Sequence, residues 1–286
     1  MNLQVPFPCF SKKSVLPIER PFRSVENTYI ETEANGGLQD LHQVQKVYSS
    51  CKASMHRHVQ ECYEAVLSGR ADTQADLDLR FTRLNPAGMM QVAMVLPFFT
   101  RLRCIKMWKT RFGPDGSEYL AKALLKLPLL RILSIEGNEI KFAGLLKLSD
   151  ALKSLAILEE LFLHSNQLGP DSGPLLAAIL PSLTRLRRFT VDENELGDKG
   201  AVLVVESIAN YCPSLVLLGL AYNGLMDVTA EKLLSCLDRL ESLGKVTFQG
   251  NSCSVEMKMR MKEAKPKAII RKRNIILSFD IILGNG

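Results

Sequence analysis

LRILSIEGN (residues 130–138) is the stretch that decides the fold of this chain, because close copies of it return at a fixed spacing. The copies are LEELFLHSN (158–166), LRRFTVDEN (186–194), LVLLGLAYN (215–223) and LGKVTFQGN (243–251). Their closing asparagines follow one another at intervals of 28, 28, 29 and 28 residues. A period in this range predicts a fold built from stacked copies of one unit, in which each unit contacts only its neighbours.

Two further copies precede these blocks and carry threonine where the others carry asparagine. They are LRCIKMWKT, which ends at Thr110, and the weaker QADLDLRFT, which ends at Thr82, so the pattern predicts about seven units. A buried asparagine amide can donate and accept hydrogen bonds along a turn whose backbone groups lack partners, and a threonine hydroxyl can do part of this. We therefore expect a structural ladder made of Thr82, Thr110, Asn138, Asn166, Asn194, Asn223 and Asn251.

The hydrophobic period changes within each unit from two residues to about 3.6, which predicts a strand followed by a helix. Helices are predicted over residues 142–155, 170–183 and 198–211. Glycines and aspartates near the helix starts, as in 113–116 and 197–200, supply turn geometry and a negative charge at the helix N-terminus. We expect short parallel strands along the inside of an arc and helices along its outside.

The 28-residue unit with a full helix resembles the ribonuclease-inhibitor class of leucine-rich repeats, and the resemblance covers residues 71–264. It implies an α/β fold, a leucine-rich-repeat solenoid shaped as a curved horseshoe, with parallel strands on the concave side and helices on the convex side. The motif is specific for the fold. It does not select a function, since the class includes inhibitors, GTPase-activating proteins, actin-filament regulators, innate sensors and axonemal components.

Three regions lie outside the repeats. Residues 1–37 contain four of the thirteen prolines and end in Asn-Gly-Gly, which predicts an extended arm. Residues 38–70 predict one or two helices that cap the first repeat, and residues 265–286 form a basic and apolar C-terminal tail. The apolar positions at helical spacing in the cap are Leu41, Val44, Val47, Tyr48, Met55, Val59, Tyr63 and Val66.

The positive charge of the chain is concentrated near its C-terminus. Residues 257–273 carry eight basic side chains and one acidic one, a net charge of +7, whereas the whole chain carries +6. Such a segment suits an acidic partner such as tubulin, nucleic acid or an anionic membrane surface, and a solvated end without a partner is the alternative. The apolar stretch NIILSFDIIL (274–283) has the composition of a strand, which either pairs with a partner or folds back. The basic residues are Lys258, Arg260, Lys262, Lys265, Lys267, Arg271, Lys272 and Arg273.

The common phosphate-binding, nucleophile and zinc motifs GxxxxGK[ST], GxGxxG, GxSxG and HExxH do not occur in the sequence. Cys51, His58 and Cys62 would share one helical face with Met55, but zinc needs a fourth ligand. This set is therefore interpreted as a packed face of the cap, with His56 pointing to solvent. We predict a protein that is not an enzyme and that holds no metal and no cofactor.

One face of the predicted sheet carries the candidate binding residues. In L-x-x-L-x-L-x-x-N the leucines point inward, so the third, fifth, seventh and eighth places face the open concave side. Aromatic side chains at these places stand among charged ones, which is typical of binding hot spots. The alternative is that the chain's own N-terminal arm covers the rings. The predicted partner-binding residues are Lys106, Trp108, Glu136, Phe162, His164, Asp192 and Tyr222.

These patterns predict a non-catalytic scaffold for protein–protein interaction, which grips a macromolecular partner with the concave face and secures it with the arm and tail. We expect a structural subunit of a large assembly such as a ciliary or flagellar cytoskeletal complex, because solenoids of this class resemble known axonemal subunits and the tail suits acidic tubulin. One alternative is a signalling regulator, either a ribonuclease-inhibitor-like binder or a GTPase activator resembling the Ran GTPase-activating protein. The other is a nucleoprotein subunit whose tail binds RNA.

The expected location is the cytoplasm, with the cytoskeleton of a cilium or flagellum as the finer prediction. Seven cysteines without a paired spacing are typical of reduced thiols in a cytosolic or nuclear setting. The N-terminus lacks the apolar core of a secretory signal, and no run approaches the roughly 18 to 20 apolar residues that cross a bilayer. Several basic residues before the first acid, Glu19, leave a mitochondrial address as the alternative.

Overall fold

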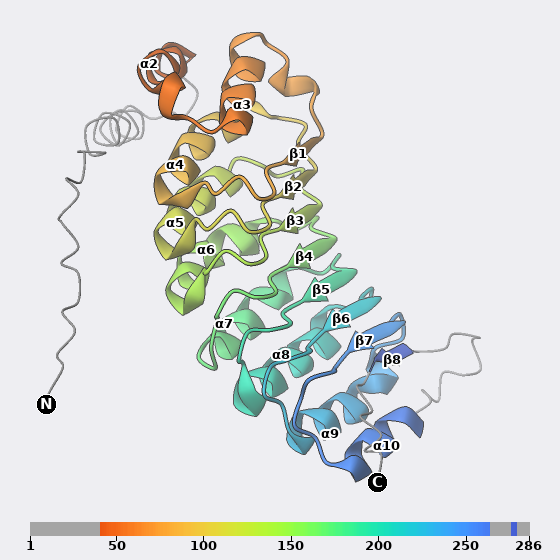
Figure 1. Cartoon of the computed structure of the whole chain (residues 1–286). Helices are drawn as coiled ribbons and strands as arrows, with labels where there is room; N and C mark the ends of the chain where they lie inside the picture. Colours follow the sequence, from red (N-terminus) through yellow and green to blue (C-terminus); the bar gives the residue numbers. More distant parts are fainter. Residues whose placement is uncertain (1–40, 264–275, 279–286) are drawn as a thin grey trace, which may run out of the picture.

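The computed structural model describes residues 41–263 and the backbone of Ile276–Ser278. In this part of the chain, eight strands form one parallel sheet whose strand order follows the chain order. Helices line one side of the sheet and leave the other side open (Figure 1). The predicted α/β class with parallel strands is therefore confirmed. The strands are β1 (Asp76–Asp78), β2 (Cys104–Lys106), β3 (Ile132–Ser134), β4 (Glu160–Phe162), β5 (Arg188–Thr190), β6 (Leu217–Gly219), β7 (Lys245–Thr247) and β8 (Ile276–Ser278).

The described helices alternate with these strands. The predicted helices 142–155 and 198–211 are confirmed as α6 and α8. The predicted helix 170–183 is divided into α7 and a 3₁₀ turn, η4, which carries Pro181 near its start, where the ring removes a backbone donor. The α-helices are α2 (Leu41–Cys51), α3 (Arg57–Leu67), α4 (Asn85–Val95), α5 (Gly113–Leu124), α6 (Lys141–Ser154), α7 (Ser172–Ile179), α8 (Gly197–Tyr211), α9 (Asp227–Cys236) and α10 (Val255–Glu263). The 3₁₀ turns are η1 (Lys52–Ser54), η2 (Ala71–Thr73), η3 (Leu96–Phe98), η4 (Leu180–Ser182) and η5 (Leu237–Arg239).

The sequence period reappears as the register of the sheet. Leu133 at the centre of β3 lies opposite Ile105 on β2 and Leu161 on β4, which are its equivalents one period away. Between β5 and β6, Phe189 lies opposite Leu218, so the register accommodates the one longer interval. The extra residue of that unit falls between Asn194 and the next strand, in the segment that contains the 15-residue helix α8. Every strand centre consequently keeps the same inward direction.

The core lies between the strands and the helices of each unit. In one unit, Leu130, Leu133 and Ile135 from the strand side and Leu145 and Leu148 from α6 are fully buried. Each such side chain contributes about 1.5–3 kcal/mol relative to an exposed position. The inward direction predicted for the leucine places is therefore confirmed.

Every unit turns at the eighth place of the repeat. All seven residues at this place have left-handed backbone conformations, with φ between 52° and 69°. A left-handed residue redirects the chain and ends the alternation of side chains along a strand. The prediction that the eighth place faces the open side together with the third, fifth and seventh places is therefore wrong. These residues are Phe81, Lys109, Gly137, Ser165, Glu193, Tyr222 and Gly250.

The predicted cap is two helices, α2 and α3, separated by η1. The predicted apolar face is buried at every position except Leu41, which is 52% exposed because it is the first residue of α2. Cys51 and Cys62 are buried on different helices, whereas His58 is exposed and its Nδ1 atom lies within hydrogen-bond distance of Glu61, at 3.0 Å. The structure thus contradicts the prediction that Cys51, His58 and Cys62 share one helical face.

His56 is exposed, as predicted, and its Nδ1 accepts a hydrogen bond from the backbone N–H of His58 at 3.3 Å, which caps α3.

The structure adds a helix to the predicted C-terminal end and selects one of the two alternatives for its apolar stretch. The first basic residues of the predicted tail, Lys258, Arg260 and Lys262, belong to α10, which packs through the buried Met257 and Met261. In addition, the backbone of Ile276–Ser278 pairs in parallel with β7, so this part of the apolar stretch folds back onto the chain's own sheet.

The other predicted tail residues, Lys265, Lys267, Arg271, Lys272 and Arg273, and the arm 1–37 lie outside the described residues. The described helices are all too short or too polar to cross a membrane.

Candidate functional site

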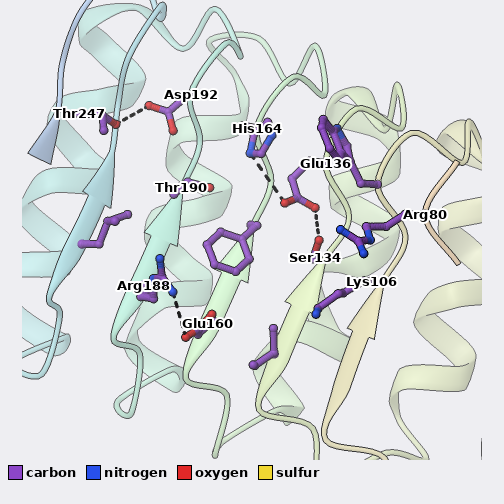
Figure 2. Close-up of a pocket in the computed structure, with 14 residues that line it drawn as sticks. Arg80, Lys106, Ser134, Glu136, Glu160, His164, Arg188, Thr190, Asp192 and Thr247 are labelled. Atoms are coloured by element: carbon purple, nitrogen blue, oxygen red, sulfur yellow. Dashed lines mark hydrogen bonds and ion pairs between the residues drawn. The ribbon is translucent and has the colours of Figure 1, made fainter. Parts of the chain in front are cut away.

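The open face of the sheet contains a shallow hollow with a volume of about 520 Å³ (Figure 2). Residues at the third, fifth and seventh places of successive units line it, which confirms the predicted direction of those places. Six of the seven predicted binding residues are brought together there: Lys106, Trp108, Glu136, Phe162, His164 and Asp192.

Tyr222 does not line the hollow. It occupies the left-handed eighth place, is 50% exposed, and lies so close to Gly250 that a Cβ atom there would come 2.1 Å from its ring. The structure therefore separates Tyr222 from the other six predicted residues, because it belongs to a turn and not to a strand face.

Trp108, the single tryptophan of the chain, is half-buried at one edge of the hollow. The centroid of its ring lies 5.0 Å from that of Phe81 and 6.4 Å from that of His164. The Nζ atom of Lys109 lies 5.1 Å from the ring centroid, a cation–π contact. Gly137 next to them has a left-handed backbone, with φ of 63°, and a Cβ atom there would come 3.0 Å from Cγ of Lys109. The indole is consequently held in one place before any partner binds.

Glu136 brings a carboxylate to the floor of the hollow, where the residue is only 8% exposed. The hydroxyl of Ser134 donates a short hydrogen bond to its Oε2 atom. Its Oε1 atom lies 3.9 Å from Nδ1 of His164, which is an ion-pair distance when the histidine is protonated but too long for a hydrogen bond. Because the serine donates to Glu136 and not to His164, the three side chains lack the nucleophile–base contact of acyl-transfer enzymes.

Arg80 also lines the hollow, beside Glu136 (Figure 2). Its guanidinium bonds to Asp78 at 2.7–3.0 Å. This contact raises the pKa of Arg80, with a smaller coulombic contribution from Glu136, and lowers the pKa of Asp78. Arg80 is therefore engaged mainly with Asp78, so it does not neutralise Glu136 by direct contact.

Asp192 brings a second carboxylate, from the unit two strands further along. Its Oδ1 atom accepts hydrogen bonds from the backbone N–H of Ala221 at 2.6 Å and from the hydroxyl of Thr247 at 2.7 Å. Gly219 makes room for the carboxylate, because a Cβ atom there would come 2.2 Å from Oδ2. Thus three other residues fix the position of Asp192 across β6 and β7.

Phe162 and Arg188 form the third part of the hollow. The guanidinium carbon of Arg188 lies 5.6 Å from the centroid of the Phe162 ring, and its Nη1 atom lies 3.6 Å from Oε1 of Glu160. Thr190 is 8% exposed beside them, and its hydroxyl has no hydrogen-bond partner among the described residues. Prediction from the sequence did not select Arg188, Thr190, Arg80, Ser134 or Thr247, although all occupy the third, fifth and seventh places that it identified.

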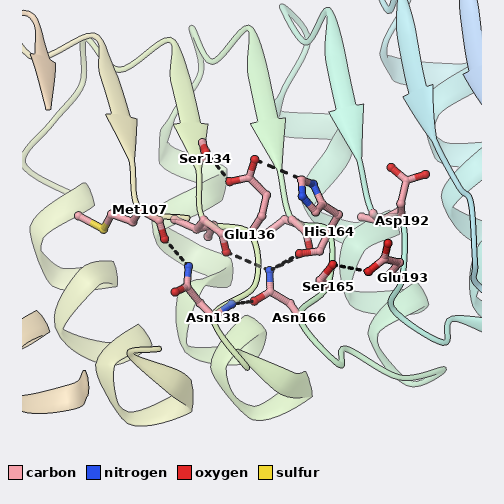
Figure 3. Close-up of polar contacts among 12 residues, drawn as sticks. Met107, Ser134, Glu136, Asn138, His164, Ser165, Asn166, Asp192 and Glu193 are labelled. Atoms are coloured by element: carbon pink, nitrogen blue, oxygen red, sulfur yellow. Dashed lines mark hydrogen bonds and ion pairs between the residues drawn. The ribbon is translucent and has the colours of Figure 1, made fainter. Parts of the chain in front are cut away.

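The predicted ladder of asparagines runs through the turns at the end of the strands (Figure 3). Each Oδ1 atom accepts a hydrogen bond from the backbone N–H of the preceding ladder residue, at 2.8–3.2 Å from Thr110 to Asn251. Each Nδ2 atom donates to backbone carbonyls, as from Asn138 to Met107 at 2.7 Å. At the start, the hydroxyl of Thr82 donates to the carbonyl of Leu79 in its own turn. The hydrogen bonds therefore link Thr110 to Asn251 in one structural ladder, as predicted, whereas the side-chain bond of Thr82 stays within its own turn.

Among the described residues, no group of three or more histidine, cysteine, aspartate or glutamate side chains is placed to hold a metal ion. Burial raises the pKa of the Cys62 and Cys212 thiols to about 12, so both stay protonated near neutral pH. These cysteines are packing residues.

No protein-family model matches the chain, and no curated protein matches it either. The candidate function therefore depends on the residues of the hollow themselves.

Proposed function

We propose that this chain is a leucine-rich-repeat solenoid of the ribonuclease-inhibitor type, which acts as a non-catalytic module and binds a protein partner with its concave face. The observation that carries the proposal is the hollow itself. It gathers half-buried aromatic rings, charges of both signs and preset carboxylates on the one sheet face that no described helix covers. Rigid aromatic side chains surrounded by charge are characteristic of interface hot spots.

The extent of the face also suits a protein partner. The lining residues come from strands β2 to β7 and from Arg80 just after β1. Seven neighbouring strands, about 4.8 Å apart, span roughly 29 Å. This width is that of a patch of about 800 Å² on each partner, the usual size of a specific protein interface.

The proposal is tested by capturing partners with tagged full-length chain and with Trp108→Ala and Phe162→Ala variants. We expect both substitutions to reduce the captured partner at least about tenfold, as the loss of a hot-spot side chain does. Tyr222→Ala is the matched control, since it removes an exposed aromatic side chain that lies outside the hollow. Thermal unfolding of each variant verifies the fold. Equal capture by all folded variants would contradict the proposal.

We propose that the protein works in a cytoplasmic assembly. More specifically, we propose a ciliary or flagellar cytoskeletal complex, in which the basic tail binds the acidic surface of tubulin. The six cysteines of the described region are buried and no disulfide joins any two of them, which supports a reducing compartment. The cytoskeletal part depends only on the charge of residues 257–273. A signalling role and an RNA-binding role compete with it.

The sheet dictates how the tail should be tested. A chain ending at Ala264 would also lose β8 and expose the edge of β7. The better variant keeps the length and replaces the five basic residues beyond the described helix α10 with glutamine: Lys265, Lys267, Arg271, Lys272 and Arg273. Loss of tubulin from the captured material would support the cytoskeletal setting. Loss of RNA would support the nucleoprotein alternative, and a small GTPase retained by both chains would support the signalling one.

A further inference from the structure

We infer that the hollow receives an arginine side chain of the partner, attracted by the carboxylates of Glu136 and Asp192, which lie on either side of His164 (Figure 2). This inference rests on the proposed binding role of the concave face and specifies the chemistry that the face recognises. The inference follows from polar side-chain atoms of the hollow that have no hydrogen-bond partner among the described residues.

The two carboxylates are held in place but are not neutralised. Glu136 receives one hydrogen bond, from Ser134, to Oε2, and its Oε1 atom has no donor within hydrogen-bond distance among the described residues. Asp192 receives both of its hydrogen bonds on Oδ1, which leaves Oδ2 without a described donor. Glu136 is only 8% exposed, and a carboxylate that is largely removed from water and lacks a cation is unfavourable, so its free oxygen favours a positively charged donor. The partly exposed carboxylate of Asp192 adds negative charge to the same hollow.

Two of the three arginine and lysine side chains that line the hollow are engaged with other carboxylates, and the third, Lys106, forms no ion pair with Glu136 or Asp192 in the described residues. Arg80 bonds to Asp78, and Arg188 lies 3.6 Å from Glu160. His164 stays 3.9 Å from Glu136. The hollow thus has room for a cation that the described part of the chain does not itself supply to these two carboxylates.

The chain contains an internal example of the proposed contact. Arg188 lies over Phe162 and beside Glu160, which combines an arginine, an aromatic ring and a carboxylate on this same face. Glu136 has a comparable neighbourhood, with Phe162 and Trp108 lining the same hollow, but no arginine bonds to it in the described residues. Guanidinium groups stack on aromatic rings and bond to carboxylates in a plane, which a lysine ammonium does not do.

Thr190 supports the same occupant. Its hydroxyl is buried without a partner, and its methyl group faces Gly219, where a Cβ atom would come 2.9 Å from Cγ2. Thr190 and Asp192 line the same hollow (Figure 2). Buried hydroxyls without a partner are rare in proteins, and a guanidinium has five N–H donors, more than two carboxylate oxygens require. An acidic or phosphorylated ligand would be repelled by both carboxylates, and Lys106 is the one lysine or arginine of the described hollow without an ion pair to attract it.

The test uses the single tryptophan of the chain as the reporter, because Trp108 lines the hollow. The probe is the blocked peptide acetyl-Gly-Leu-Arg-Leu-Gly-amide, which contains no aromatic residue. We expect its addition to change the fluorescence of Trp108 with a midpoint on the order of 1 mM, as suits a short peptide. The same peptide with citrulline in place of arginine carries a neutral group of the same shape. Because it lacks the charge, its midpoint concentration should be at least about tenfold higher.

Two variants and one control locate the effect. Glu136→Gln keeps an acceptor for Ser134 and removes the charge, so the preference for arginine over citrulline should fall to less than about threefold. Thr190→Val replaces the hydroxyl with a methyl group of similar size and should weaken arginine binding about threefold. Glu193→Gln is the matched control, because Glu193 is exposed outside the hollow and bonds to Ser165 at 2.7 Å. It should leave the midpoint unchanged.

The inference is overturned by the absence of a fluorescence change, by equal binding of the citrulline peptide, or by an unchanged midpoint in folded Glu136→Gln and Thr190→Val. Its failure is distinct from failure of the proposed function. If Trp108→Ala abolishes partner capture and Glu136→Gln does not, the concave face binds a partner but does not select arginine.

Discussion

Replacement of Asn166 by alanine tests the ladder at its centre. Asn166 is fully buried, and its Oδ1 atom accepts a hydrogen bond from the backbone N–H of Asn138 at 2.9 Å. Its Nδ2 atom donates to the carbonyl of Ile135 at 3.0 Å and to that of Leu163 at 2.8 Å. The Leu163 carbonyl also accepts from Asn194 at 3.0 Å, so it retains a partner in the variant.

The magnitude follows from the groups left without partners. Asn166→Ala removes the acceptor of the Asn138 N–H and the only hydrogen-bond donor that the described structure gives to the Ile135 carbonyl. Leaving a buried polar group unsatisfied costs about 1–3 kcal/mol, so we expect a loss of about 3 kcal/mol for the pair. For a folded region of this size, that corresponds to a fall in melting temperature of about 6–12 °C. Asn166→Thr should lower the unfolding free energy by less than Asn166→Ala, because a threonine, Thr110, already occupies the equivalent place in its own unit.

The assay is urea unfolding followed by circular dichroism, with melting temperature as a second readout. Asn210→Ala is the matched control, since Asn210 is exposed and its side chain accepts a hydrogen bond from Arg239 at the surface. It should change the unfolding free energy by less than about 0.5 kcal/mol. A loss below about 1 kcal/mol at Asn166, or one equal to that at Asn210, would refute the view that the ladder stabilises the stack.

Two further predictions concern packing and ionisation. Gly173→Ala should lower the unfolding free energy by about 1–3 kcal/mol in the same assay, because its Cβ atom would come 2.1 Å from Cα of Gly200 on the neighbouring helix. Gly244→Ala should leave the unfolding free energy nearly unchanged, because the nearest atom to its new Cβ would be 3.6 Å away. Equal losses of stability in the two variants would contradict the packing argument. Burial raises the pKa of the Cys62 thiol to about 12, so above pH 9 the unfolded chain loses this proton first and stability should fall with rising pH. Unfolding measured between pH 8 and about pH 11 checks this, and a Cys62→Ala variant whose pH slope matched the original chain would count against it.

The sequence by itself determined the repeating part of the fold. The places of Asn138, Leu133 and Trp108 within their units follow from local periodicity, because equivalent residues one period apart experience the same neighbours. The direction of a side chain on a strand is likewise a local property. For this reason six of the seven predicted binding residues line one hollow, and the predicted ladder has the expected hydrogen bonds.

The tertiary structure alone decided the contacts between units and the ends of the sheet. Asp192 and Thr247 are 55 residues apart, and no local pattern indicates that their side chains meet. The same holds for the pairing of β8 with β7, and for Tyr222, which the turn removes from the hollow. The physical reason is that periodicity determines which way a residue points. Which groups approach within hydrogen-bond distance depends on how successive units stack in space.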